Sequence, residues 1–293
     1  MNQSQVSANK RSSTFIGIVF AMLAVFFFCV QDVQVKYLSS FYAIFHIIWT
    51  KSLVQFIIVF LVLFIKKRKH FFTSSNYKIQ YLRGASYFTA TILFFYGLKN
   101  LPMTTAVTLS FVAPFIVSLL GWLLLKERVE LKRWLVIIFG FTGVLIITRP
   151  GIGEFNWASL YVLSAAFFWS LFQILSRYLK EDGPANTLML SSTVCFILAS
   201  FCIPFFWSWI NDYKLFLMLT GLGIWAALAE YYMIKAYMKA LASFIAPVFY
   251  FMIVWYTIFG YFVFTEIPDF FTILGCIVII VFGLLNLKLA PKI

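Results

Sequence analysis

Hydrophobic side chains in this chain occur in long runs, separated by short polar segments. A helix needs about 20 mainly apolar residues to cross about 30 Å of hydrocarbon. Alternation at period two, which would indicate the strands of a membrane barrel, is absent, and the runs are too long for such strands. The pattern predicts ten membrane-spanning helices, at roughly 15–38, 41–65, 79–98, 102–125, 133–148, 157–179, 187–208, 214–238, 242–265 and 269–289.

Composition agrees with a membrane location. The chain has 293 residues, of which 63% are hydrophobic and 11% charged. A soluble domain of this size cannot hide so much apolar surface, because its outer face is largely polar. The connections between the runs leave no room for an extramembrane domain. We therefore expect an all-α polytopic membrane protein, with the lipid bilayer as its main surroundings.

The net charge of +13 does not indicate a nucleic-acid partner, because Lys and Arg lie at the ends of the predicted spans. With a cytoplasmic N-terminus, 18 of these 23 bases fall on the cytoplasmic side. Such asymmetry follows the positive-inside rule. It predicts an inner-membrane protein with both termini in the cytoplasm. The other five bases lie outside or in the outer half of a span: Lys36, Lys51, Lys99, Arg149 and Lys214.

Two parts of the chain resemble each other. Residues 24–38 read AVFFFCVQDVQVKYL and residues 165–179 read AAFFWSLFQILSRYL, a shift of 141 positions. A second match, at a shift of 139, places Glu127 opposite Glu266, each six residues after a glycine. The alternative is that apolar spans resemble one another by composition alone. Two matches at nearly one shift favour an internal repeat.

The repeat divides the chain into residues 1–148 and 149–293, with five predicted spans each. Since five is odd, the second half must enter the membrane from the opposite side. Inverted repeats of this kind are typical of transporters, which alternate access around a site at mid-depth. A bend is expected within the fourth span, where Pro114 removes a backbone hydrogen bond.

The segments YGLKNLPMTTAVTLSFVAPF, GWLLLKERV and GYFVFTEIP, together with the five-plus-five pattern, resemble the EamA branch of the drug/metabolite transporter superfamily. The resemblance covers nearly the whole chain. The pieces DVQVKYL, KRWLVIIFGFTGVLIITRP and APVFYF are most similar to S-adenosylmethionine uptake carriers. Two departures are Lys51, where family members commonly have arginine, and Met252 in a ninth span without a carboxylate.

This resemblance implies secondary transport of a small cationic or zwitterionic metabolite, with S-adenosylmethionine uptake as the leading example. The first alternative is an exporter of amino acids or drugs on the same fold. A structural or signalling membrane protein without flux is a further alternative. The resemblance also implies a cavity lined by spans 1–4 and 6–9, with the fifth and tenth spans at the periphery, where a homodimer could form.

Ionisable side chains deep in a bilayer are costly and mark function by default. Asp32 lies in the outer half of the first span, where it either faces the cavity or pairs with Lys36 at i+4. Glu230 lies deep in the eighth span. It is a candidate cation ligand or proton carrier, and its alternative role is pairing with Lys235 or Lys239.

Lys51 lies about ten residues into the second span, about 15 Å deep on helical rise. We expect it to face the cavity as the counter-charge of a substrate carboxylate or of Asp32. Gln55 follows on the same helix face.

Aromatic side chains at mid-depth are candidate walls for a cation or a stacked ring. Trp169 is one of these, because Gln173 lies one turn away on the same face. Tyr250 and Tyr256 in the ninth span are similar candidates.

The sequence does not favour an enzyme. The two histidines, His46 and His70, fall on opposite membrane sides, and neither a P-loop nor a metalloprotease motif is present. No cofactor or metal site is therefore expected. The four cysteines lie in apolar spans without a C-x-x-C pair: Cys29, Cys195, Cys202 and Cys276.

Overall fold

A computed structural model of the chain describes residues 3–65, 72–125, 131–149, 156–179, 182, 184–210, 212–239 and 246–288. This described part is helical and contains no strand. Its elements are α1 (Gln3–Leu38), α2 (Ile44–Ile65), α3 (Tyr77–Asn100), α4 (Met103–Ser110), α5 (Ala113–Leu125), α6 (Leu131–Thr148), α7 (Ala158–Tyr178), α8 (Pro184–Phe206), α9 (Tyr213–Lys239), the 3-10 helix η1 (Ala246–Tyr250), α11 (Phe251–Phe264) and α12 (Phe270–Lys288).

Each predicted span coincides with a helix or a pair of helices. Within the described residues, six stretches are long and apolar enough to cross a membrane: Phe15–Leu38, Ile44–Ile65, Met103–Leu124, Ala158–Ser176, Asn186–Phe206 and Tyr213–Met233. The apolar helices Trp134–Thr148, Val248–Phe264 and Phe270–Leu285 are shorter. The protein is therefore a polytopic membrane protein.

The fourth span is broken, as Pro114 predicted. Phe111 and Val112 lie between α4 and α5, and their N–H groups donate to carbonyls three residues back, each at 3.2 Å. A proline has no N–H with which to continue the α-helical pattern to the carbonyl four residues earlier, that of Ser110. The ninth span is also irregular, because η1 precedes α11.

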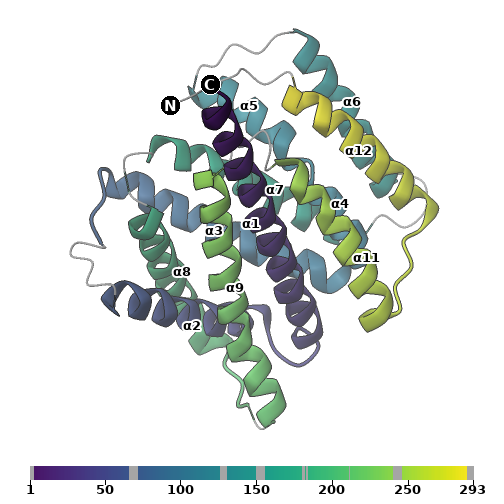
Figure 1. Cartoon of the computed structure of the whole chain (residues 1–293). Helices are drawn as coiled ribbons and strands as arrows, with labels where there is room; N and C mark the ends of the chain where they lie inside the picture. Colours follow the sequence, from purple (N-terminus) through teal and green to yellow (C-terminus); the bar gives the residue numbers. More distant parts are fainter. Residues whose placement is uncertain are drawn as a thin grey trace.

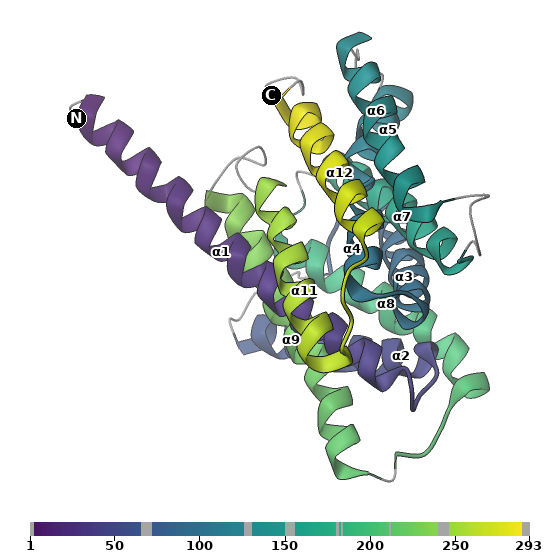
Figure 2. The same ribbon diagram turned by 90° about the vertical axis from the view of Figure 1, so that its right-hand side faces the viewer.

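Helices from the two ends of the chain pack against each other. α1 packs against α9 and α11, α3 against α7 and α8, and α2 against α8 and α9. Figure 1 shows α1 lying between α9 and α11. In both views the start of α1 and the end of α12 lie toward the same end of the bundle (Figures 1 and 2).

α6 and α12 form a pair at one edge of the bundle (Figure 1). Glycines bring them close. A Cβ added to Gly143 would lie 2.9 Å from the carbonyl oxygen of Gly275, and one added to Gly275 would lie 2.7 Å from that of Gly143. Small residues at a helix interface permit such backbone approach in membranes. The edge position agrees with the peripheral place expected for the fifth and tenth spans.

Replacing Gly275 with Leu is expected to destabilise the protein, because its side chain must displace the α6 backbone and Ile147. Overpacking of this kind costs about 1–3 kcal/mol. The melting temperature of the purified protein, followed by tryptophan fluorescence in detergent, should fall. Ile277→Leu is the control, since Ile277 is 55% exposed on the same helix. Equal melting temperatures for the two variants would contradict this packing.

Candidate functional site

A chain of polar contacts joins three helices in the interior. Lys51 on α2 is 3% exposed, and its ammonium donates to the Tyr87 hydroxyl on α3 at 3.4 Å. That hydroxyl donates to Oε1 of Glu230 on α9 at 2.9 Å. The ammonium also lies 5.4 Å from the ring centre of Tyr87 and 5.7 Å from that of Phe95. We call Lys51, Tyr87 and Glu230 the central triad.

A second acid lies next to the central triad. Asp32 on α1 is 5% exposed and accepts hydrogen bonds from the Tyr256 hydroxyl on α11 and from Gln31 Nε2, the latter at 3.2 Å. The charge of Lys51 interacts with the charges of both Glu230 and Asp32. The structure thus brings together the three ionisable residues that the sequence singled out, from three different spans.

Arg83 on α3 adds a second buried cation. Its Nε donates to Ser176 at 2.7 Å and its Nη1 to Ser191 at 2.5 Å, and the guanidinium lies 4.2 Å from the ring centre of Phe172. Its charge interacts with that of Glu230. The site therefore holds two acids and two bases, which offset one another in surroundings where an uncompensated charge is strongly unfavourable.

Aromatic rings flank the triad on the α7 side. The ring centre of Trp169 lies 5.9 Å from that of Tyr87 and 5.2 Å from that of Phe172, with which it stacks. Trp169 is thus placed beside the triad. Gln173 is partly buried one turn further along α7, and no hydrogen bond joins it to the triad within the described residues.

The remaining two candidates lie differently. Gln55 is 4% exposed and one turn from Lys51 on α2. Tyr250 instead points toward α12, because a Cβ on Gly283 would lie 2.0 Å from its hydroxyl oxygen. Its ring contacts Phe111 edge-on, with ring centres 5.0 Å apart. Tyr256, the other tyrosine proposed in the ninth span, is the one that contacts Asp32.

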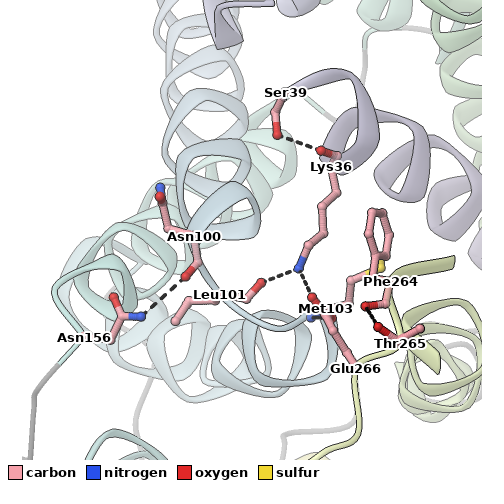
Figure 3. A network of polar contacts seen from close by, with 9 residues as sticks. All are labelled: Lys36, Ser39, Asn100, Leu101, Met103, Asn156, Phe264, Thr265 and Glu266. Atoms are coloured by element: carbon pink, nitrogen blue, oxygen red, sulfur yellow. Dashed lines mark hydrogen bonds and ion pairs between the residues drawn. The ribbon is translucent and has the colours of Figure 1, made fainter. Parts of the chain in front are cut away.

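Lys36 does not pair with Asp32, so the alternative of a structural i,i+4 pair is wrong. Its ammonium donates to Glu266 Oε1 at 2.5 Å and to the Leu101 carbonyl at 2.6 Å, while the Met103 N–H donates to Glu266 Oε2 at 2.8 Å (Figure 3). We call these four residues the Lys36–Glu266 network. It ties the last turn of α1 to the start of α4 and to the segment after α11.

Glu230 is bonded within the triad, and no ion pair joins it to Lys235 in the part of the chain that is described. The Lys235 ammonium lies over the rings of Tyr231 and Phe20, at 4.5 and 5.4 Å. Glu127, which the internal repeat places opposite Glu266, lies outside the described residues.

The Lys36–Glu266 ion pair is expected to show strong energetic coupling, because its side chains are only 11% and 22% exposed. We predict that Lys36→Met and Glu266→Gln each lower the free energy of unfolding, and that the double variant loses less than the sum. Coupling energies for residues in contact are about 0.5–3 kcal/mol. Unfolding in mixed detergent would measure the free energy of unfolding of the wild type and the three variants. A loss in the double variant equal to the sum of the two single losses would contradict the pairing.

Comparisons with known proteins agree on one class. Residues 15–149 match the EamA-like transporter family. The S-adenosylmethionine uptake transporter of Rickettsia prowazekii (strain Madrid E) is 26% identical over 265 residues, which cover 90% of each chain. The riboflavin transporter of Vibrio cholerae serotype O1 is 33% identical over 151 residues, 50% of this chain and 49% of its own. A protein of known crystal structure, whose sequence is 16% identical to this chain, has the same fold. The TM-score is 0.64, and the match covers 93% of this chain and 95% of that one.

Proposed function

We propose that this chain is an EamA-type carrier that takes up S-adenosylmethionine across the inner membrane by alternating access. The observation that carries this proposal is a set of opposite charges on α1, α2 and α9, of which Asp32 and Lys51 are buried and Glu230 is partly buried. These three residues come from three spans, and the charge of Lys51 interacts with those of Asp32 and Glu230. Charged groups so deep in a membrane protein mark substrate or ion pathways.

The chemistry of this site suits the proposed substrate. S-adenosylmethionine has a sulfonium cation, an ammonium, a carboxylate and a planar purine. The buried carboxylate of Asp32 and the partly buried one of Glu230 can face its cationic groups, and Lys51 can face its carboxylate. The rings of Trp169 and Tyr87 offer π faces to a cation or to the purine. The name of the Rickettsia relative, which covers most of the chain, supports the same substrate.

The packing of the helices supports two inverted five-helix repeats, residues 1–148 and 149–293. α1 and α7 are the first helices of the two halves, and α3 and α9 are their third spans. The contact of α1 with α9 therefore corresponds to that of α7 with α3, and both pairs are in contact. In the same way, the contact of α2 with α9 corresponds to that of α8 with α3, which are also in contact. Halves with matching contacts can exchange shapes, and that exchange underlies alternating access in inverted-repeat carriers.

Polar contacts at the two ends are candidates for closing the pathway. At one end lie the Lys36–Glu266 network and an ion pair between Arg149 and Asp269. At the other end Asp182 accepts hydrogen bonds from Ser74, Ser75 and Gln80: 2.5 Å, 2.7 Å and 2.8 Å. The positive-inside rule assigns the first end to the outer face and both termini to the cytoplasm.

Uptake of radiolabelled S-adenosylmethionine into cells that express the protein tests the proposal. We expect accumulation above that of cells with an empty vector, and competition by unlabelled S-adenosylmethionine in excess. Unlabelled riboflavin and amino acids, added separately, test the substrates of the alternative carriers. Absence of labelled uptake above background, with the protein present in the membrane, would overturn the substrate assignment.

A further inference from the structure

The two charged ends of the central triad do not touch each other directly. The Tyr87 hydroxyl stands between them, accepting from the Lys51 ammonium at 3.4 Å and donating to the Glu230 carboxylate at 2.9 Å. A single hydroxyl group therefore spans the space between a buried cation and a partly buried anion. The first of these contacts is long for a bond from an ammonium, since such bonds are usually shorter than 3 Å.

We propose that the Tyr87 hydroxyl holds the place of an α-amino-acid group, and that the carrier recognises its substrate by an ammonium and a carboxylate on one carbon atom. This inference rests on the proposed function and names the part of the substrate that the triad reads. The substrate carboxylate accepts from Lys51, and its ammonium donates to Glu230. Each protein group then keeps the donor or acceptor role that it has with Tyr87.

Exchange of the hydroxyl for a zwitterion is favourable on electrostatic grounds. Each bond of Tyr87 joins an ion to a neutral hydroxyl, whereas a zwitterion places a full opposite charge against each ion, and the attraction between charges is stronger inside a protein than in water. A zwitterion brings one charge of each sign, so the net charge of the buried site stays the same. In the absence of substrate, the hydroxyl keeps both ions from being left unpaired, which is the costly state in an apolar interior.

The other charged groups of the site already have partners. Arg83 donates to Ser176 and Ser191, and Asp32 accepts from Tyr256 and Gln31. Lys51 is thus the cation whose bond to the protein is weakest and longest, and it is the one that can turn to a carboxylate.

Its aromatic neighbours hold Tyr87 in place. Trp169 and Phe172 on α7 pack around its ring, with ring centres 5.9 and 5.2 Å away. Tyr87 is therefore a positioning residue, which sets the spacing of Lys51 and Glu230 before substrate enters. A compound with only an ammonium or only a carboxylate would bind Glu230 or Lys51 alone. The other of these two residues would keep only its bond to the Tyr87 hydroxyl.

Competition by matched analogues tests this inference. Unlabelled S-adenosylmethionine and its decarboxylated form compete against labelled S-adenosylmethionine for uptake. In the wild type we expect the decarboxylated compound to compete at least about tenfold less well, a difference of about 1.4 kcal/mol. Lys51→Met should remove most of this ratio, and Lys214→Met, at an exposed lysine near the start of α9, should keep it. Equal competition by both compounds in the wild type would overturn the inference.

Tyr87→Phe tests whether the Tyr87 hydroxyl only occupies the site in the absence of substrate or itself binds the substrate. If the hydroxyl only holds a place, its loss leaves the competition ratio near the wild-type value even where the amount of protein falls. A ratio that collapses in Tyr87→Phe as it does in Lys51→Met would show that the hydroxyl itself binds the substrate, against the inference.

A binding measurement decides the inference even if S-adenosylmethionine is not carried. Purified protein is heated with L-methionine, with its methyl ester and with the corresponding amine that lacks the carboxylate. We expect L-methionine alone to raise the melting temperature, and Lys51→Met to abolish that rise. Equal effects of the acid and the amine, or no effect of L-methionine, would refute the α-amino-acid site, whatever the result of the uptake assay.

Discussion

Glu230→Gln is expected to lower uptake of labelled S-adenosylmethionine by at least about tenfold, with the protein still present in the membrane. The change keeps the shape of the side chain and a carbonyl acceptor for the Tyr87 hydroxyl. It removes the negative charge that offsets Lys51 and Arg83. Because hydrogen bonds to charged groups contribute about 1.5–3 kcal/mol, binding of a cationic group of the substrate at this place should be strongly weakened.

The matched control for this variant is Asp212→Asn. Asp212 is exposed just before α9 and accepts a hydrogen bond from the Lys214 N–H at 2.7 Å. The control makes the same kind of change near the other end of the same helix, and its uptake should equal that of the wild type. Initial rates over a range of substrate concentrations, normalised to the protein in the membrane, measure the effect. Wild-type uptake by Glu230→Gln would remove Glu230 from the site.

Asp32→Asn is the second change with a large expected effect. It leaves the side chain able to accept from Tyr256 but removes the buried negative charge. We expect uptake of S-adenosylmethionine to fall by about tenfold or more, since a buried anion that faces a cation is lost. Tyr256→Phe should have a smaller effect, because Asp32 keeps its charge and its bond from Gln31.

The charge of the substrate separates a binding role of Asp32 from a structural one. S-adenosylhomocysteine has the same amino-acid and purine parts but no sulfonium charge. If Asp32 faces the sulfonium, Asp32→Asn should weaken competition by S-adenosylmethionine much more than competition by S-adenosylhomocysteine. Equal weakening for both compounds would indicate that Asp32 supports the fold and does not read the charge.

The helices could be predicted from the sequence because the cause acts along the chain. Long apolar runs must become helices in lipid, where backbone groups have no water to bond with. The break at residues 111–112 follows from Pro114 for a similarly local reason. Asp32, Lys51 and Glu230 stood out because an ionisable group in an apolar run is costly wherever it points.

The partners of these residues could not be predicted, because they depend on which helices meet. Tyr87 is one of 15 tyrosines, and no local pattern marks it as the link between Lys51 and Glu230. Arg83 looked like a base at the cytoplasmic end of a span. Lys36 bonds to Glu266, 230 positions away, in preference to an acid one turn away on its own helix.

The two tyrosines of the ninth span show the same limit. Tyr250 and Tyr256 are equally plausible in the sequence, since both are aromatic residues of one apolar run. Only the packing of α11 between α1 and α4 turns Tyr256 to Asp32, while Tyr250, at the end of η1, lies against α12. Orientation around a helix axis is decided by tertiary contacts, and a uniformly apolar run gives little sign of it.

Counterflow in liposomes that contain only the purified protein tests the central claim, that this chain carries S-adenosylmethionine through the triad site. Liposomes loaded with unlabelled S-adenosylmethionine are diluted into a trace of the labelled compound. The wild type should accumulate the label transiently, and Glu230→Gln should accumulate at least about tenfold less under the same conditions. Accumulation by the wild type no greater than in protein-free liposomes, or equal accumulation by both proteins, would contradict the account.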